Sequence, residues 1–451
     1  MIVLPNAVMA ILIIAVLASA IAVSRVAFPR SFPLVAVHNG IWIVVLALVG
    51  MNLIDYHEFG LAAWLTLVLG LTAFNVGAWA ATASARAIPS NGGASSADLP
   101  IIGALGLAVL GALYAVGYTA FLVTISSRFG LDTLFNDPES IRGSGDYLAS
   151  VPMPFRGLLH VGPMLFALLA YPAASRVRIP LLVRVLLLVA IAVSLLTLLQ
   201  RTNLFMGVLL AAALWLSGSE VQKLVGVARR GPRRRPILVA VAAGGVLLAG
   251  FQIVGDALGK NDSNGLSGSV APALADTPFA SAYLYLTSGT PAFLGLTQSH
   301  NPDWPPEVSR GSVTGDYNPQ TWGAALAEPA LSIFPIIEPW EPIAPFTDVG
   351  TSTNVYTWFE PFYRDFRELG VALGAFAIGG CAAYFFSRRH DSARNQWLSA
   401  LLLAVVIFAP FTQKIHNTLT LLTLAMILIL TARASLEHRR RTRELEALAS
   451  R

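Results

Sequence analysis

The stretch AVMAILIIAVLASAIAV, residues 7–23, contains no charged side chain and decides the fold class. Runs of this kind recur along a chain of 451 residues that is 55% hydrophobic and only 12% charged. A helix of about 20 apolar residues crosses the hydrocarbon core of a bilayer, which is about 30 Å thick. The composition therefore predicts an all-α polytopic integral membrane protein rather than several soluble domains.

The first run is expected to be retained as a helix, because no basic residue precedes it and Arg25 and Arg30 follow it. The single cysteine, Cys381, lies inside another apolar run. One cysteine excludes a disulfide framework and a cysteine-based metal site.

Hydropathy predicts eleven membrane spans, near residues 7–23, 33–54, 60–85, 100–125, 157–174, 181–199, 203–217, 236–254, 368–387, 397–411 and 418–432. The predicted organisation is spans one to eight within residues 1–254, a large extracytoplasmic loop at 255–367, spans nine to eleven within 368–432, and a basic tail at 433–451.

Basic residues alternate between the predicted connections. Most of the 30 lysines and arginines lie in every second connection and in the tail. The positive-inside rule makes these segments cytoplasmic, with the N-terminus outside and the C-terminus inside. The basic runs then meet anionic lipid, and a nucleic-acid partner is not expected.

The long connection at 255–367 lies on the opposite face and is acidic. Four tryptophans and several apolar segments favour a structured loop over a disordered one. Residues 282–296 are expected to form a short helix or a re-entrant element. The tryptophans, which offer stacking surfaces for sugars or anchor the loop, are Trp304, Trp322, Trp340 and Trp358.

Two short predicted hairpins carry cations on this same outer face. The span at 203–217 is about 22 Å long at about 1.5 Å per residue, shorter than the hydrocarbon core. Arg201, Lys414 and His416 would therefore lie slightly below the outer surface. Such cations either extend to the lipid headgroups or face protein, water or an anionic ligand.

The stretch TNVYTWFEPFYRDFRELG, residues 353–370, concentrates aromatic and charged residues before a span. Thr357 and Glu360 fit a capping box, and the predicted helix continues from 357 into the 368–387 span. Glu360, Arg364 and Glu368 then follow one another at i, i+4 and i+8. An amphipathic lead-in helix explains this ladder, but it does not require Asn354, Tyr356 or Asp365.

The same stretch resembles the signature of the bacterial oligosaccharide repeat-unit polymerases, the Wzy-type or O-antigen polymerase family. The resemblance is carried by Asn-Val-Tyr-Thr at 354–357, an aromatic-Pro-aromatic step, and Tyr-x-Asp-Phe at 363–366. AYLYLTSGT at 282–290 and Arg201 after a span resemble two further segments of that family. One departure is that the family pattern continues Asp-Phe-Gly, where this chain has Arg367.

The resemblance implies a glycosyltransferase of the GT-C class at the outer leaflet of the bacterial plasma (inner) membrane. Such enzymes polymerise oligosaccharide units carried on polyprenyl (undecaprenyl) pyrophosphate during surface polysaccharide biosynthesis, without a nucleotide sugar or other cofactor. The expected partners are the lipid-linked donor and acceptor, membrane lipids, and a chain-length regulator as an open possibility.

This chemistry needs a general base at the acceptor hydroxyl and cations at the departing pyrophosphate. No Asp-x-Asp or His-x-x-x-His pair demands a metal. Asp365 is the first choice for the base, with His416 and Glu360 as alternatives. The remaining assignments are Arg201 and Arg364 to pyrophosphate, Lys414 and Arg367 as helpers, and Asn354, Tyr356, Thr357 and Tyr283 to substrate binding.

Other functions remain open at this point. A glycan ligase would use the same donor with another acceptor. A polyprenyl-phosphate-sugar transferase would use an acidic pair in the first outer loop, where Asp55 and Glu58 lie, although a plain turn explains these better. A flippase would instead place polar residues near mid-membrane. A non-catalytic scaffold would leave the recessed cations unexplained.

Overall fold

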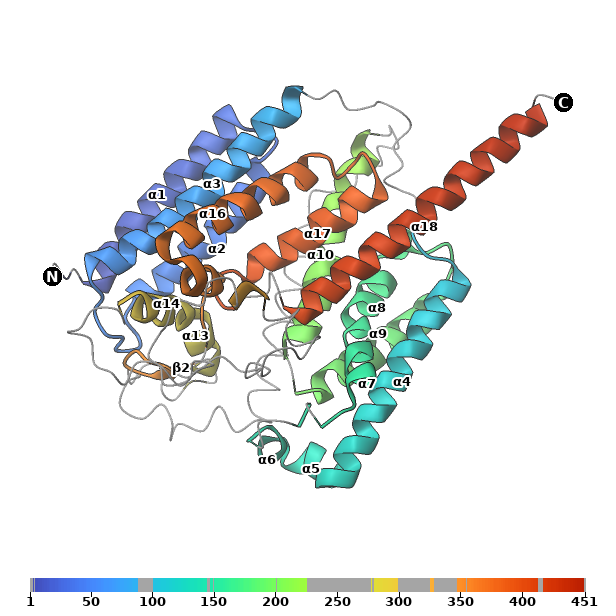
Figure 1. Cartoon of the computed structure of the whole chain (residues 1–451), viewed down its shortest axis with the longest axis horizontal. Helices are drawn as coiled ribbons and strands as arrows, with labels where there is room; N and C mark the ends of the chain where they lie inside the picture. Colours follow the sequence, from blue (N-terminus) through green and yellow to red (C-terminus); the bar gives the residue numbers. More distant parts are fainter. Residues whose placement is uncertain are drawn as a thin grey trace. The chain divides into compact units, whose positions relative to one another are not determined.

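The computed structural model is mostly helical (Figure 1). It describes residue 3 and residues 5–87, 100–143, 147–148, 150–199, 201–224, 277, 280–298, 325–327, 347–353, 355–412 and 417–449. Six helices in these ranges are long and apolar enough to cross a membrane, namely Asn6–Ala27, Phe32–Gly50, Leu61–Ser84, Ala104–Phe129, Met153–Ala170 and Glu360–Ser387. The described part of the chain is thus mostly helical, as expected of a membrane protein.

Four shorter apolar helices also coincide with predicted spans: Leu181–Thr197, Thr202–Leu216, Ala393–Phe408 and Thr418–Ala434. The predicted span at 236–254 lies outside the described residues, so the count of eleven stays a prediction. The expected helical character of residues 282–296 is confirmed, because α13 (Ala280–Thr287) and α14 (Gly289–Gln298) cover this stretch.

The chain forms two compact units. The first contains residues 1–89, 261–387 and 405–418. Its long helices are α1 (Asn6–Ala27), α2 (Phe32–Gly50), α3 (Leu61–Ala87) and α16 (Glu360–Ser387), and it also holds α13, α14, β1 (Thr347–Asp348) and β2 (Ser352–Thr353). Figure 1 shows α3 lying along α16, while α1 packs on α2.

The α3–α16 contact is made by glycines. A side chain at Gly77 would collide with the carbonyl oxygen of Phe376, and one at Gly379 would collide with that of Phe74. Because each glycine faces the backbone of the other helix, the two helices approach more closely than larger residues allow. Small residues serve this purpose between membrane helices, where lipid removes the hydrophobic drive for association.

The second unit contains residues 90–260, 388–404 and 419–451. Its helices are α4 (Ala104–Phe129), α5 (Leu131–Asn136), α6 (Pro138–Gly143), α7 (Met153–Leu159), α8 (Val161–Ala170), α9 (Leu181–Thr197), α10 (Arg201–Leu224) and most of α18 (Thr418–Ala449), with the short η1 (Pro172–Ala174). α17 (Ala393–Phe408) begins in this unit and ends in the first.

Hydroxyl pairs join α4 to α9 within the second unit. Tyr114 bonds Ser194 at 2.6 Å, and Tyr118 bonds Thr197 at 2.7 Å. The two tyrosine rings are also stacked on each other. These pairs satisfy polar groups inside otherwise apolar helices, as a membrane interior requires.

The helix that carries the candidate site is broken, and the prediction of one continuous helix from 357 into the span is wrong. α16 begins at Glu360, and Phe366 and Arg367 have non-helical backbone angles, with φ of −138° and 55°. The chain folds back there, since side chains at Gly370 and Gly374 would collide with Phe362. Glu368 therefore does not continue the ladder of Glu360 and Arg364.

Candidate functional site

The candidate site is built on the loop between α2 and α3. The Tyr56 hydroxyl bonds Thr287 Oγ1 in α13 at 2.6 Å, and the His57 amide donates to the Val349 carbonyl at 2.9 Å. Asn6 Nδ2 donates to the His57 carbonyl at 2.9 Å. The loop thereby ties the start of α1, the α13–α14 pair and the β1–β2 hairpin together.

The β1–β2 hairpin leads the chain into the site segment. Thr347 pairs with Thr353, and Asp348 pairs with Ser352. Gly350 has a φ of 97°, and a side chain there would collide with the carbonyl of Asp55, so only glycine fits this turn. Of the predicted acidic pair Asp55 and Glu58, Asp55 therefore meets the hairpin through its backbone carbonyl.

Aromatic packing holds the residues just before α16. The Trp358 amide donates to the Ala409 carbonyl at 2.9 Å, and the Trp358 ring lies 5.9 Å from the His38 ring and 5.6 Å from that of Phe74. Phe359 stacks on Trp42 at 5.8 Å. These aromatic residues form a buried core beneath the site.

Arg364 and Glu360 form a buried ion pair at the start of α16. Arg364 Nε lies 2.5 Å from Glu360 Oε1, and the two residues are only 7% and 8% exposed. Nε is occupied by Glu360, whereas Arg364 Nη2 has no hydrogen-bond partner within the described part of the chain. A guanidinium has five N–H donors, and leaving buried donors unpaired is costly. This cation can therefore still bind an anion or a sugar oxygen.

Tyr356 lies against this cation. Its ring centroid is 5.9 Å from the Arg364 guanidinium carbon, and the residue is 3% exposed. Burial raises the pKa of Tyr356 well above its usual range, more strongly than Arg364 lowers it. The hydroxyl consequently stays protonated near neutral pH and is able to donate a hydrogen bond.

Asp365 is fully buried, and both of its oxygens are engaged. Oδ1 accepts the Ala325 amide at 3.0 Å, and Oδ2 accepts the Leu326 amide at 2.9 Å. These two amides belong to a helical turn at residues 325–327 in the long connection. The Asp365 carboxylate, which was predicted to be the base, is thus bound to residues 325–326 of the long connection.

The other predicted substrate-binding residues of the first unit are inside the scaffold. The Tyr283 hydroxyl donates to the Leu48 carbonyl, and burial raises the pKa of Tyr283. Thr357 is fully buried, and its Oγ1 accepts the Phe359 amide at 3.4 Å. The Arg367 guanidinium lies 5.3 Å from the centroid of the Tyr363 ring.

Only part of the predicted residue set comes together in one unit. Tyr356, Glu360, Arg364 and Asp365 lie in a single segment of the first unit. Arg201 is the first residue of α10 in the second unit. The remaining predicted residues and tryptophans lie outside the described residues: Asn354, Lys414, His416, Trp304, Trp322 and Trp340.

Arg367 is expected to tolerate glycine better than alanine. In a helix, alanine is more stable than glycine by about 1 kcal/mol. At a φ of 55° the order should reverse, because the strained backbone costs a non-glycine residue about 1–3 kcal/mol. Both Arg367→Gly and Arg367→Ala remove the contact with Tyr363, so their difference isolates the backbone. Thermal unfolding in detergent should show Arg367→Gly to be the more stable; equal stability would contradict the strain.

His38 is a site-supporting residue that the sequence interpretation missed. It is fully buried, its ring stacks on Phe74 at 3.8 Å, and Nδ1 contacts Asn39 Oδ1 at 2.8 Å. Nε2 has no hydrogen-bond partner among the described residues. The sequence does contain a signal for it, since His38 and Asn39 are adjacent polar residues inside an apolar run. Ionisable residues within membrane helices usually have a functional or structural role.

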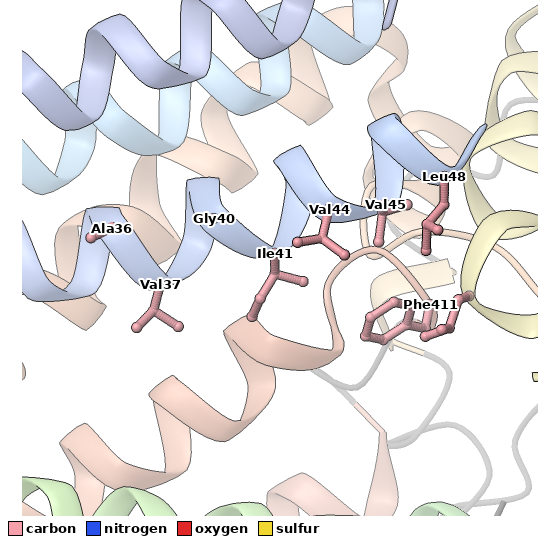
Figure 2. Close-up of a pocket in the computed structure, with 9 residues that line it drawn as sticks. Ala36, Val37, Gly40, Ile41, Val44, Val45, Leu48 and Phe411 are labelled. Carbon is pink, nitrogen blue, oxygen red and sulfur yellow. The ribbon is translucent and has the colours of Figure 1, made fainter. Parts of the chain in front are cut away.

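An apolar pocket of about 450 Å³ lies along one face of α2 (Figure 2). Its lining consists of Ala36, Val37, Gly40, Ile41, Val44, Val45 and Leu48 of α2, with Leu286 and Phe411. None of these side chains can form a hydrogen bond, so the pocket is unsuited to a sugar or a pyrophosphate. The buried charged groups described above lie instead in the Tyr356–Asp365 segment.

The described residues contain no group of three histidine, cysteine, aspartate or glutamate side chains placed to hold a metal ion. In comparisons with known proteins, no family model, curated protein or solved structure matches the chain.

Proposed function

We propose that this protein is a membrane glycosyltransferase that polymerises oligosaccharide units carried on polyprenyl pyrophosphate. The observation that carries the proposal is the buried Arg364, whose Nη2 has no hydrogen-bond partner among the described residues and which lies inside the segment resembling the Wzy-type signature. Arginine suits pyrophosphate because its planar fork matches phosphate oxygens in bidentate geometry.

In the proposed reaction, a hydroxyl of the acceptor sugar attacks the donor carbon that bears the pyrophosphate. A new glycosidic bond forms, the bond to the pyrophosphate oxygen breaks, and the hydroxyl proton passes to a base. Arg364 stabilises the charge that develops on the leaving pyrophosphate, with Arg201, Lys414 and Arg367 as further cations. Tyr356 and Asn354 hydrogen-bond the sugar.

The proposed setting is the outer leaflet of a bacterial plasma membrane, with the N-terminus outside and the C-terminus in the cytoplasm. Support comes from the arginine-rich connections on one face and the acidic connection that contains the site segment on the other. In this arrangement the units reach the enzyme after transfer across the membrane, and neither a nucleotide sugar nor another cofactor takes part.

A deletion strain tests the proposed activity. Loss of a polymerase should leave lipid-linked single repeat units on the outer leaflet and should remove long surface polysaccharide, because units arrive but are not joined. Mass spectrometry of extracted lipid-linked glycans would measure this, with the wild-type gene restored on a plasmid as control. Accumulation of finished but unattached polymer would instead indicate a ligase, and units held on the cytoplasmic leaflet would indicate a flippase.

A further inference from the structure

Asp365 joins two parts of the chain that are forty residues apart in sequence. Its carboxylate accepts two consecutive backbone amides, those of Ala325 and Leu326, at 3.0 and 2.9 Å. The residue is fully buried, and it directly precedes the break in α16 at Phe366 and Arg367. The turn at residues 325–327 is therefore fastened next to the Arg364–Glu360 pair.

Two such hydrogen bonds fix the carboxylate in place. Hydrogen bonds to an ionised group are roughly twice as strong as neutral ones, and losing this carboxylate would leave two backbone N–H groups of the 325–327 turn without their acceptor, which is costly. The same geometry is well suited to holding the loop in place.

We infer that Asp365 is a positioning residue that clasps residues 325–326 of the long connection to the Arg364 segment. This inference rests on the proposed function for its catalytic consequence. The clasp holds residues 325–326 beside the segment in which the pyrophosphate and sugar would bind. Proton acceptance then falls to another group, and Glu360 and His416 are the candidates from the sequence.

A covalent replacement of the clasp tests the inference. Asp365→Cys is combined with Ala325→Cys or with Leu326→Cys, in a Cys381→Ala background that removes the only native cysteine. A disulfide spans a Cα separation of about 4.4–6.8 Å, and the two pairs test both positions whose amides Asp365 holds. The purified full-length protein is assayed for polymer formation from lipid-linked repeat units, before and after reduction.

A clasp predicts that at least one oxidised pair restores polymer formation to within tenfold of wild type and that reduction removes the recovery. Asp365→Cys without a second cysteine is the control and should remain inactive under the same oxidant. If Asp365 is instead the catalytic base, the double-cysteine variants should be inactive in both redox states, because no carboxylate is present at position 365. The inference is overturned if a disulfide forms and activity stays absent, or if neither pair can be oxidised.

Hydrogen exchange separates the clasp from the enzymatic activity. Asp365→Ala should speed the exchange of the Ala325 and Leu326 amides, which lose their acceptor, whereas Asp348→Asn should not. Asp348 is an exposed aspartate of the hairpin whose Oδ1 accepts the nearby Gly350 amide. Faster exchange in a protein that never forms polymer would support the clasp and rule out the proposed function. Unchanged exchange of the two amides would rule out the clasp.

Discussion

Replacing Arg364 with alanine is expected to reduce polymer formation by at least about a hundredfold, the usual effect of losing one group that stabilises transition-state charge. Arg364 is 7% exposed, and its Nη2 has no hydrogen-bond partner among the described residues. A single substitution, however, also leaves Glu360 buried without its partner. Breaking a buried ion pair in this way destabilises a protein by about 3–5 kcal/mol. Loss of activity must therefore be separated from loss of folding.

The double variant Glu360→Gln/Arg364→Gln makes this separation. Neutralising both partners removes the unpaired charge, so thermal stability should recover relative to Arg364→Ala. If Arg364 binds the pyrophosphate, the double variant should remain about a hundredfold less active than wild type despite its recovered stability. Recovery of polymer formation along with stability would mean that Arg364 only balances Glu360. The assay measures the polymer formed per folded enzyme from lipid-linked repeat units.

The membrane helices could be predicted from the sequence because their signal is local. The run at 7–23 lies within α1, and the runs at 33–54 and 60–85 correspond to α2 and α3. A helix in lipid must satisfy its backbone internally and present apolar side chains, so hydropathy alone locates it. The Glu360–Arg364 pair was also predictable, since an i, i+4 spacing places both on one helix face.

The break in α16 could not be predicted in the same way. Asp365-Phe366-Arg367-Glu368 contains no glycine or proline, so local propensity favours a continuous helix. The break depends on contacts distant in sequence, namely the Asp365 carboxylate held by residues 325–326 and Phe362 packed on Gly370 and Gly374. One signal was present: Arg367 occupies the position where the resembled family has glycine, and its φ is positive.

The close pairing of α3 and α16 leads to the prediction with the largest effect on folding. Gly77→Ala should lower the thermal stability of the protein, and Gly77→Leu should prevent recovery of folded protein. A single methyl group at Gly77 meets the backbone carbonyl of Phe376, which cannot rotate away as a side chain would. The helices must therefore separate, and over-packing of a well-filled interface costs about 1–3 kcal/mol even when side chains can adjust.

Gly111 provides the matched control for this substitution. It lies within α4, and a side chain there would meet no atom within 4 Å. Gly111→Ala should therefore be neutral or should stabilise the protein by up to about 1 kcal/mol through helix propensity. Thermal unfolding of both alanine variants in the same detergent compares the same added methyl group in two settings. If Gly77→Ala is as stable as Gly111→Ala, the backbone of Phe376 does not pack closely on Gly77.

The same pair of variants links helix packing to the site. Gly70, about two helical turns earlier on the same face of α3, lies against the Phe359 ring and Val371, so separating α3 from α16 also disturbs the start of α16. Glu360 is the first residue of α16, and Arg364 lies four residues further along the same helix. Gly77→Ala should therefore lower polymer formation per folded molecule as well as stability, whereas Gly111→Ala should leave both intact. A destabilised Gly77→Ala protein with full activity would show that the site segment is held by α14 and the α2–α3 loop alone.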